Sequence, residues 1–168
     1  MSRVYIGYDR CGIEGVGDEF VHFIFDVVIA LTKLSDRNEV GLVITDDAHL
    51  RELNAQYRHQ DRPTNILSFA YAETNPKDFV PKGDKYYLGD IYISYDRVEA
   101  QAKQARVRNK DEFARLFVHG LFHLAGVHHG SAKEAKRMEA LEDRAWEHIA
   151  AAESGRRSPD LALRGSLG

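Results

Sequence analysis

The chain has 168 residues, of which 43% are apolar and 29% are charged. This length and composition are those of one soluble domain with a single sizeable core. No apolar run reaches the roughly 18 residues of a membrane span, and the first residues lack the apolar stretch of a signal peptide. The one cysteine, Cys11, excludes an internal disulfide framework. We therefore expect a cytoplasmic protein with no membrane partner.

The net charge of −3 excludes a protein that binds nucleic acid through its charge as a whole. Residues 97–110 are locally basic, because five Lys or Arg residues stand there against Glu99 alone, a net charge of +4. This segment is either a solvated helix face or a rim that contacts phosphate groups.

Hydrophobic periodicity and turn residues predict helices on both sides of a small sheet. In chain order, we expect a strand over 4–8, a helix over 18–34, a strand over 39–45, a helix from Asp46 or Asp47 to Tyr57, a strand over 66–72, a polar excursion over 74–85, a strand over 87–94, and helices over 96–105, 110–125 and from Ser131 or Ala132 to about 152. Asp18 is a plausible N-cap of the first helix. This order favours an α+β fold, with a small mixed β-sheet packed against helices, over a regular βαβ array.

The most informative motif lies in the fourth predicted helix. His119 and His123 are four residues apart, so on a helix they share one face with Cβ atoms roughly 5–6 Å apart. Gly126 can end the helix in a left-handed conformation, and the chain can then bring His129 beside the first two histidines. Three imidazoles that converge are typical of a Zn²⁺ site, and three protein ligands leave a fourth position open for catalysis. We therefore expect one zinc ion per chain, held by this central metal-binding helix.

The pattern H-x-x-x-H-x-x-G-x-x-H is the ligand spacing of metzincin proteases. Those enzymes carry a glutamate directly after the first histidine, where it serves as the general base. Gly120 occupies that position here and cannot accept a proton. The sequence therefore disfavours peptide hydrolysis by that route.

Several segments together point to a known family. They are Leu53-Asn-Ala-Gln-Tyr-Arg58, Asp61-Arg-Pro-Thr-Asn-Ile-Leu-Ser-Phe69, Leu88-Gly-Asp-Ile-Tyr-Ile-Ser94 and His119-Gly-Leu-Phe-His-Leu-Ala-Gly-Val-His-His129 with Glu134-Ala-Lys-Arg-Met-Glu139. On these segments the chain resembles the YbeY family of rRNA maturation endoribonucleases, in which glycine also replaces the metzincin glutamate. One departure is the pair Val127-His128, where the family usually has Tyr-Asp.

The resemblance implies a zinc-dependent endoribonuclease that cleaves single-stranded RNA. The implied role is ribosomal RNA processing, especially at the 3′ end of the small-subunit rRNA, with ribosome quality control. The implied partners are ribosomal RNA and the ribosome or its small subunit. His119, His123 and His129 match the family's metal ligands, and Arg58 matches an arginine of its active-site cleft. We therefore expect Arg58, His119 and His123 to be catalytic, in a single catalytic domain over residues 1–153 followed by a flexible tail over 154–168.

Two other interpretations remain open from the sequence. The first is a metal-dependent hydrolase of another class, such as a peptidase, which would need a general base elsewhere in the chain. The second is a ribosome-assembly factor without catalytic activity, whose zinc is structural. For the nuclease, either an activated water or the RNA 2′-OH could attack the phosphodiester, and the sequence shows no general base that decides between them.

Overall fold

The computed structural model describes residues 3–71 and 86–157. The predicted excursion over 74–85 and most of the predicted tail lie outside these residues. The chain forms two compact units that divide after Val127. The first contains β1 Arg3–Tyr8, α1 Asp18–Leu31, β2 Glu39–Thr45, α2 Asp47–Arg58, β3 Ile66–Ala70, β4 Tyr87–Ser94, α3 Tyr95–Ala105 and α4 Asn109–Leu124, and the second contains α5 Ala132–Arg157.

The described strands form one mixed sheet in the order β1-β2-β4-β3. β1 pairs with β2 and β2 with β4 in parallel, while β3 pairs with β4 in antiparallel orientation. The parallel strands are connected through helices, as parallel pairing requires. β3 therefore forms an edge of the sheet, and this edge carries most of the candidate site.

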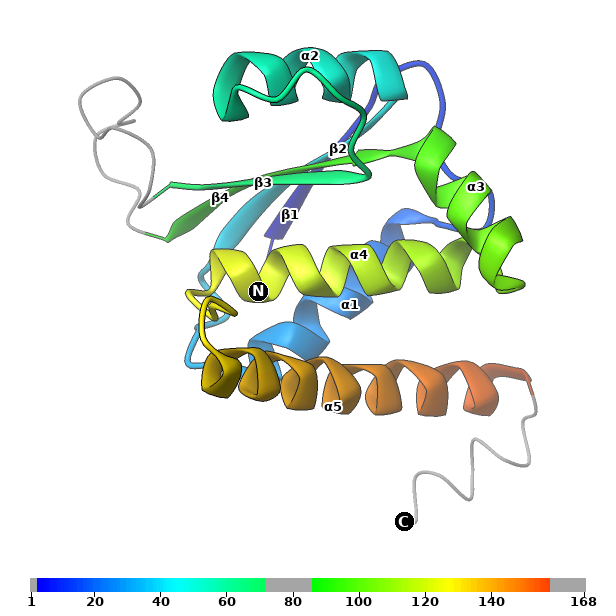
Figure 1. Cartoon of the computed structure of the whole chain (residues 1–168). Coiled ribbons are helices and arrows are strands. Elements are labelled where there is room, and N and C mark those ends of the chain that lie inside the picture. The colour runs from blue at the N-terminus through cyan, green and yellow to red at the C-terminus, as the bar shows by residue number, and fades with distance from the viewer. Residues whose placement is uncertain (1–2, 72–85, 158–168) are drawn as a thin grey trace. The chain divides into compact units, whose positions relative to one another are not determined.

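Helices cover both faces of this sheet. Figure 1 shows α2 over one face, and α1 with α4 under the other. The α4 side holds the apolar core, since α4 and the strand residues above it are nearly inaccessible to water. The largest fully buried side chains of the first unit are Phe25, Phe113, Phe117, Phe122, Ile24, Leu42, Ile44, Leu50, Ile91, Ile93 and Leu121. This arrangement confirms the α+β class predicted from the sequence.

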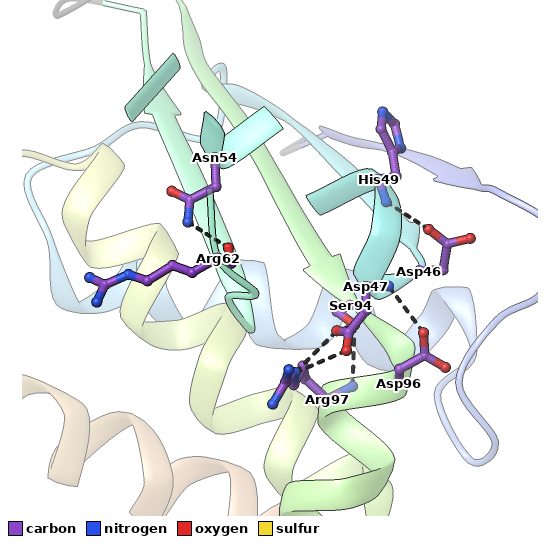
Figure 2. Close-up of polar contacts among 8 residues, drawn as sticks. All are labelled: Asp46, Asp47, His49, Asn54, Arg62, Ser94, Asp96 and Arg97. Atoms are coloured by element: carbon purple, nitrogen blue, oxygen red, sulfur yellow. Dashed lines mark hydrogen bonds and ion pairs between the residues drawn. The ribbon is translucent and has the colours of Figure 1, made fainter. Parts of the chain in front are cut away.

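A polar cluster anchors the N-terminus of α2 (Figure 2). The Asp47 carboxylate accepts hydrogen bonds from Ser94 Oγ at 2.7 Å and from Arg97 Nε at 3.0 Å, and the Asp47 backbone N–H donates to Asp96 at 3.0 Å. Asp46 caps the helix by accepting from the His49 N–H at 2.8 Å. These bonds fix α2 to the start of α3, and thus fix where Arg58 emerges at the opposite end of α2.

The predicted elements agree with the structure at most boundaries and fail at the first helix. Strands β2 and β4 begin and end where the sequence predicted. Asp18 is not the N-cap of α1, because Gly17 holds that position and the Asp18 carboxylate instead accepts from the Tyr8 hydroxyl at 2.5 Å. α1 stops at Leu31, three residues early, since Thr32 Oγ1 turns back onto the Val28 carbonyl at 3.0 Å.

The second unit consists largely of α5. Ser131 starts this helix by accepting from the Glu134 N–H at 3.1 Å, as predicted, and the helix continues to Arg157, five residues beyond the predicted end. Met138, Ala145 and Ile149 are its buried side chains. In the described part of the chain, no helix is both long enough and apolar enough to cross a membrane.

Candidate active site at the edge of β3

The predicted histidine helix is confirmed as α4, Asn109–Leu124. His119 and His123 are half-buried, whereas most neighbours on the helix are fully buried. Phe113 and Lys110 contact Phe20 of α1, with ring centroids 6.4 Å apart and Lys110 Nζ 4.5 Å from the ring. At about 100° per residue, Gly120 lies about 100° from His119 and about 60° from His123 around the axis of α4, so both histidines lie to one side of the line that Gly120 follows.

Gly120 brings α4 into close contact with the sheet. A Cβ atom at this position would lie 3.0 Å from Ile66 Cδ1, 3.0 Å from Ser68 Oγ and 3.1 Å from Ile91 Cδ1. The first two atoms belong to β3, so β3 lies directly over the helix turn that carries His119 and His123. The space that a glutamate would need after the first histidine is occupied by the sheet. This packing explains the glycine that the sequence shows in place of the protease base.

The end of α4 is a Schellman turn, as the glycine predicted. The Val127 N–H donates to the Phe122 carbonyl at 2.9 Å, and the Gly126 N–H donates to the His123 carbonyl at 3.0 Å. Gly126 has φ +86°, which L-residues other than glycine rarely adopt. Val127 is buried, as the apolar residue after a Schellman glycine commonly is. Val127 therefore serves as the buried residue of this turn. It is also the first position at which the sequence departs from the usual family pattern.

Ser68 connects α4 to Arg58 through the middle of β3. Tyr71 N–H bonds to the Leu88 carbonyl and Ser94 N–H to the Asn65 carbonyl. With the register of the pair, odd-numbered residues of this segment point their backbone groups toward β4 and even-numbered residues point theirs outward. The Ser68 carbonyl thus faces away from the sheet, where it accepts from Arg58 Nη2 at 2.7 Å.

Arg58 is the last residue of α2, followed by His59 in the left-handed conformation with φ 55°. Its guanidinium lies 5.2 Å from the centre of the Phe69 ring and is exposed to solvent. The nearby Asp61 carboxylate pairs with Arg51 at 2.8 Å. Arg58 is therefore held by a backbone carbonyl and a ring, and its charge is not neutralised by Asp61.

Two elements that carry predicted catalytic residues thus contact one strand. Arg58 of α2 bonds to the outward carbonyl of Ser68 in β3, and α4 packs against β3 at Gly120, which lies between His119 and His123 in the sequence. Sequence reasoning missed the importance of the Ser68 carbonyl. Its outward direction follows only from the register of β3 with β4, which the sequence does not show.

The predicted metal ligands come from both units of the chain. Among residues 3–71 and 86–157, no group of three or more His, Cys, Asp or Glu side chains is placed to hold a metal ion. His129 belongs to the second unit and is exposed, so its role as third ligand remains a prediction. The donors suit zinc in kind, because neutral imidazoles are among its ordinary ligands.

The predicted basic rim over 97–110 is largely committed to structural contacts. Arg97 pairs with Asp47 at 3.0 Å, Arg108 pairs with Asp111 at 2.9 Å, and Lys110 lies over a ring of α1. Burial tends to raise the pKa of Asp111, but the hydrogen bonds from Arg108 outweigh it and hold this pKa below its usual value. Arg108 and Lys110 thus fix the start of α4, while Arg97 fixes α2 to α3.

The fold and the site define an α+β protein whose candidate active site combines an arginine and a pair of helix histidines at the edge of a mixed sheet. The family model described as endoribonuclease YbeY matches residues 15–150. The chain belongs to this family, which confirms the resemblance seen in its sequence.

Relatives and a solved structure agree with this assignment. An endoribonuclease YbeY of Sinorhizobium fredii is 40% identical over 109 residues, covering 65% of this chain and 61% of the relative. The Persephonella marina protein of the same name is 33% identical over 151 residues, covering 89% of this chain and 94% of the relative. The solution structure of TM1509 from Thermotoga maritima is similar with a TM-score of 0.54 at 24% identity, over 90% of this chain and 93% of that one. At that identity the likeness concerns the fold alone.

Proposed function

We propose that this chain is a zinc-dependent endoribonuclease that cleaves single-stranded ribosomal RNA. Within that proposal, it acts in the cytoplasm on the 3′ end of small-subunit rRNA and in ribosome quality control. The family model and relatives named endoribonuclease YbeY support the nuclease role. The observation that carries the proposal is that Arg58 and the helix of the histidine pair both contact the edge strand β3.

In this proposal, His119, His123 and His129 hold the zinc ion. Zinc, when bound, supplies Lewis acidity toward water and phosphoryl oxygen at neutral pH. The chain contributes the orientation of the ligands. The packing of Gly120 under β3 and the Schellman turn after His123 fix the direction of α4, so the first two imidazoles are preorganised.

Arg58 binds and orients the phosphate. Its Nη2 bond to the Ser68 carbonyl uses one of the five N–H donors of a guanidinium, and the planar fork suits bidentate contact with a phosphate. Phosphoryl transfer depends mainly on positioning and on stabilisation of developing charge. A cation fixed at the edge of the strand that α4 also contacts suits both tasks.

The same edge argues against a peptidase. The outward carbonyls of Ile66 and Ser68 already accept hydrogen bonds from Thr64 Oγ1, at 3.2 Å, and from Arg58. A peptide that adds to a sheet edge needs such carbonyls as acceptors. With these acceptors occupied, the edge presents donors and a cation, which suit a phosphate backbone better. Gly120 removes the usual protease base as well.

The test compares zinc content and cleavage of single-stranded ribosomal RNA in purified protein. Wild type is expected to carry about one zinc per chain and to cut the RNA. His119→Ala should lose both, and Arg58→Ala should keep zinc but lose cutting by roughly 100-fold or more, the typical effect of removing a donor that stabilises transition-state charge. His22→Ala on α1 is the control for a half-buried histidine, and Arg51→Ala is the control for an exposed arginine on α2.

Each failure has its own meaning. If His119→Ala and Arg58→Ala cut as well as wild type, the activity belongs to a contaminant and the nuclease proposal is wrong. If wild type holds zinc and binds ribosomal particles but does not cut RNA, the assembly-factor interpretation replaces the nuclease proposal.

A further inference from the structure

Three aromatic side chains form a continuous strip beside Arg58. Phe69 of β3 contacts Tyr57 of α2 with ring centroids 5.4 Å apart and ring planes at 69°. On its other side Phe69 contacts Tyr92 of β4 at 5.9 Å and 81°. Tyr57, Phe69 and Tyr92, here called the aromatic strip, thus run from the outer edge of the sheet across β3 and β4 on the face that α2 covers.

The strip remains accessible to solvent. Tyr57 is 54% exposed, and Phe69 and Tyr92 are half-buried. The rings meet edge to face. A large aromatic surface left in water beside a candidate active site is more typical of a binding surface than of a core.

The chemistry next to the strip selects its occupant. The Arg58 guanidinium lies over the Phe69 ring at 5.2 Å. A cation and a row of aromatic rings thus lie side by side, within the length of one nucleotide. Proteins that bind single-stranded nucleic acid combine these two features, because phosphates follow the cations while bases stack on the rings.

We propose that the aromatic strip is a base-stacking subsite that holds single-stranded RNA next to the cleavage position. The proposal rests on the proposed nuclease function and adds where the bases lie. Arg58 joins the two parts, since it contacts the strip through Phe69 and the candidate active site through Ser68. An RNA bound in this way has its bases on the α2 face of β3 and its backbone along the strand edge.

The test measures the dissociation constant of a 2′-O-methyl oligoribonucleotide, whose intactness is checked on a gel, and of a matched oligonucleotide with abasic sites. Tyr57→Ala should weaken binding of the base-containing oligonucleotide roughly 5- to 100-fold, the range for loss of one aromatic stacking partner. It should leave binding of the abasic oligonucleotide unchanged. Phe69→Leu, which keeps an apolar side chain on the strand, should act in the same direction, and Arg58→Ala should weaken binding of both oligonucleotides.

Tyr5→Ala is the matched control. Tyr5 is 53% exposed, nearly the same as Tyr57, and lies on β1, at the opposite edge of the same sheet. Its loss should leave both dissociation constants unchanged.

The outcomes separate the two proposals. If Tyr57→Ala and Phe69→Leu bind the base-containing oligonucleotide as wild type does while wild type still cuts RNA, the subsite is refuted and the nuclease stands. The strip would then be covered by another part of this chain or by a protein. If Tyr57→Ala weakens both oligonucleotides equally, the residue does not act through stacking, and the subsite is again refuted. If wild type binds neither oligonucleotide, the subsite and the nuclease proposal fail together.

Discussion

The contact between α4 and β3 at Gly120 can be tested by adding side-chain atoms there. Gly120→Ala places a Cβ atom 3.0 to 3.1 Å from three side-chain atoms, two of them on β3. Gly120→Glu, which recreates the protease sequence, places four further heavy atoms (Cγ, Cδ and two carboxylate oxygens) and a charge in the same space. Both changes also remove the conformational-entropy cost of holding a glycine within a helix.

These terms can be compared in size. Replacing a mid-helix glycine stabilises the helix by roughly 0.5–1 kcal/mol, and overpacking a core contact costs about 1–3 kcal/mol. Gly120→Ala should therefore lose up to about 2 kcal/mol of unfolding free energy. Gly120→Glu adds the cost of a poorly solvated carboxylate, about 1–3 kcal/mol, so it should lose roughly 3–5 kcal/mol, a large fraction of the 5–15 kcal/mol typical of a domain.

Urea unfolding followed by circular dichroism measures both variants. Gly130→Ala is the steric control, because a Cβ atom there would have no neighbour within 4 Å and its backbone is not in the left-handed region. A Gly120→Glu protein as stable as wild type would refute the close approach of α4 to β3. If that protein also hydrolysed peptides, the argument that packing excludes the protease base would be wrong.

Three other substitutions test the elements around the site. Gly89→Ala should cost about 3–5 kcal/mol in urea unfolding, because its φ is +142° and its Cβ would lie 2.1 Å from the Phe69 carbonyl oxygen; full stability would contradict the pairing of β3 with β4. Gly126→Ala should cost about 1–2 kcal/mol through its positive φ and should lower zinc affinity measured with a competing chelator, whereas an unchanged affinity would separate the turn from metal binding. Asp111→Asn should cost about 0.5–1 kcal/mol at neutral pH through the lost bonds to Arg108. The folded-state pKa of Asp111 is lowered, so its stabilisation is complete above the usual pKa and disappears as the pH falls through the lowered pKa. The unfolding free energies of wild type and Asp111→Asn should therefore converge in acid. A difference that stays constant with pH would contradict this origin.

Much of the fold could be predicted because its signals are local. The β-branched pattern of β2, the Asp46 cap and the Gly126 turn each depend on a few neighbouring residues. The strand order could not be predicted, since β4 lies between β2 and β3 although β3 precedes it in sequence. The error at Asp18 has the same cause, because its partner Tyr8 belongs to another element.

The candidate site could be predicted where single side chains define its chemistry. Imidazole spacing gave His119 and His123, and family resemblance gave Arg58. The link between them depends on the Ser68 carbonyl, a backbone group that every residue type carries, so no side-chain pattern could reveal it. The aromatic strip was missed for a related reason, because Tyr57 and Phe69 come from different elements and meet only after α2 packs over the sheet.

The spacing of the site is set by residues without side chains. β3 is approached closely from below by Gly120 of α4 and from the side by Gly89 of β4, and at each position a single methyl group would press on β3 atoms. Packed contacts of this kind deform little, so β3 is held in place between α4 and β4. Because Arg58 is bonded to the middle of that strand, its position relative to the histidine helix is fixed by the same two glycines. The residues proposed to do the chemistry are visible in the sequence, whereas the close approaches that position their elements are not.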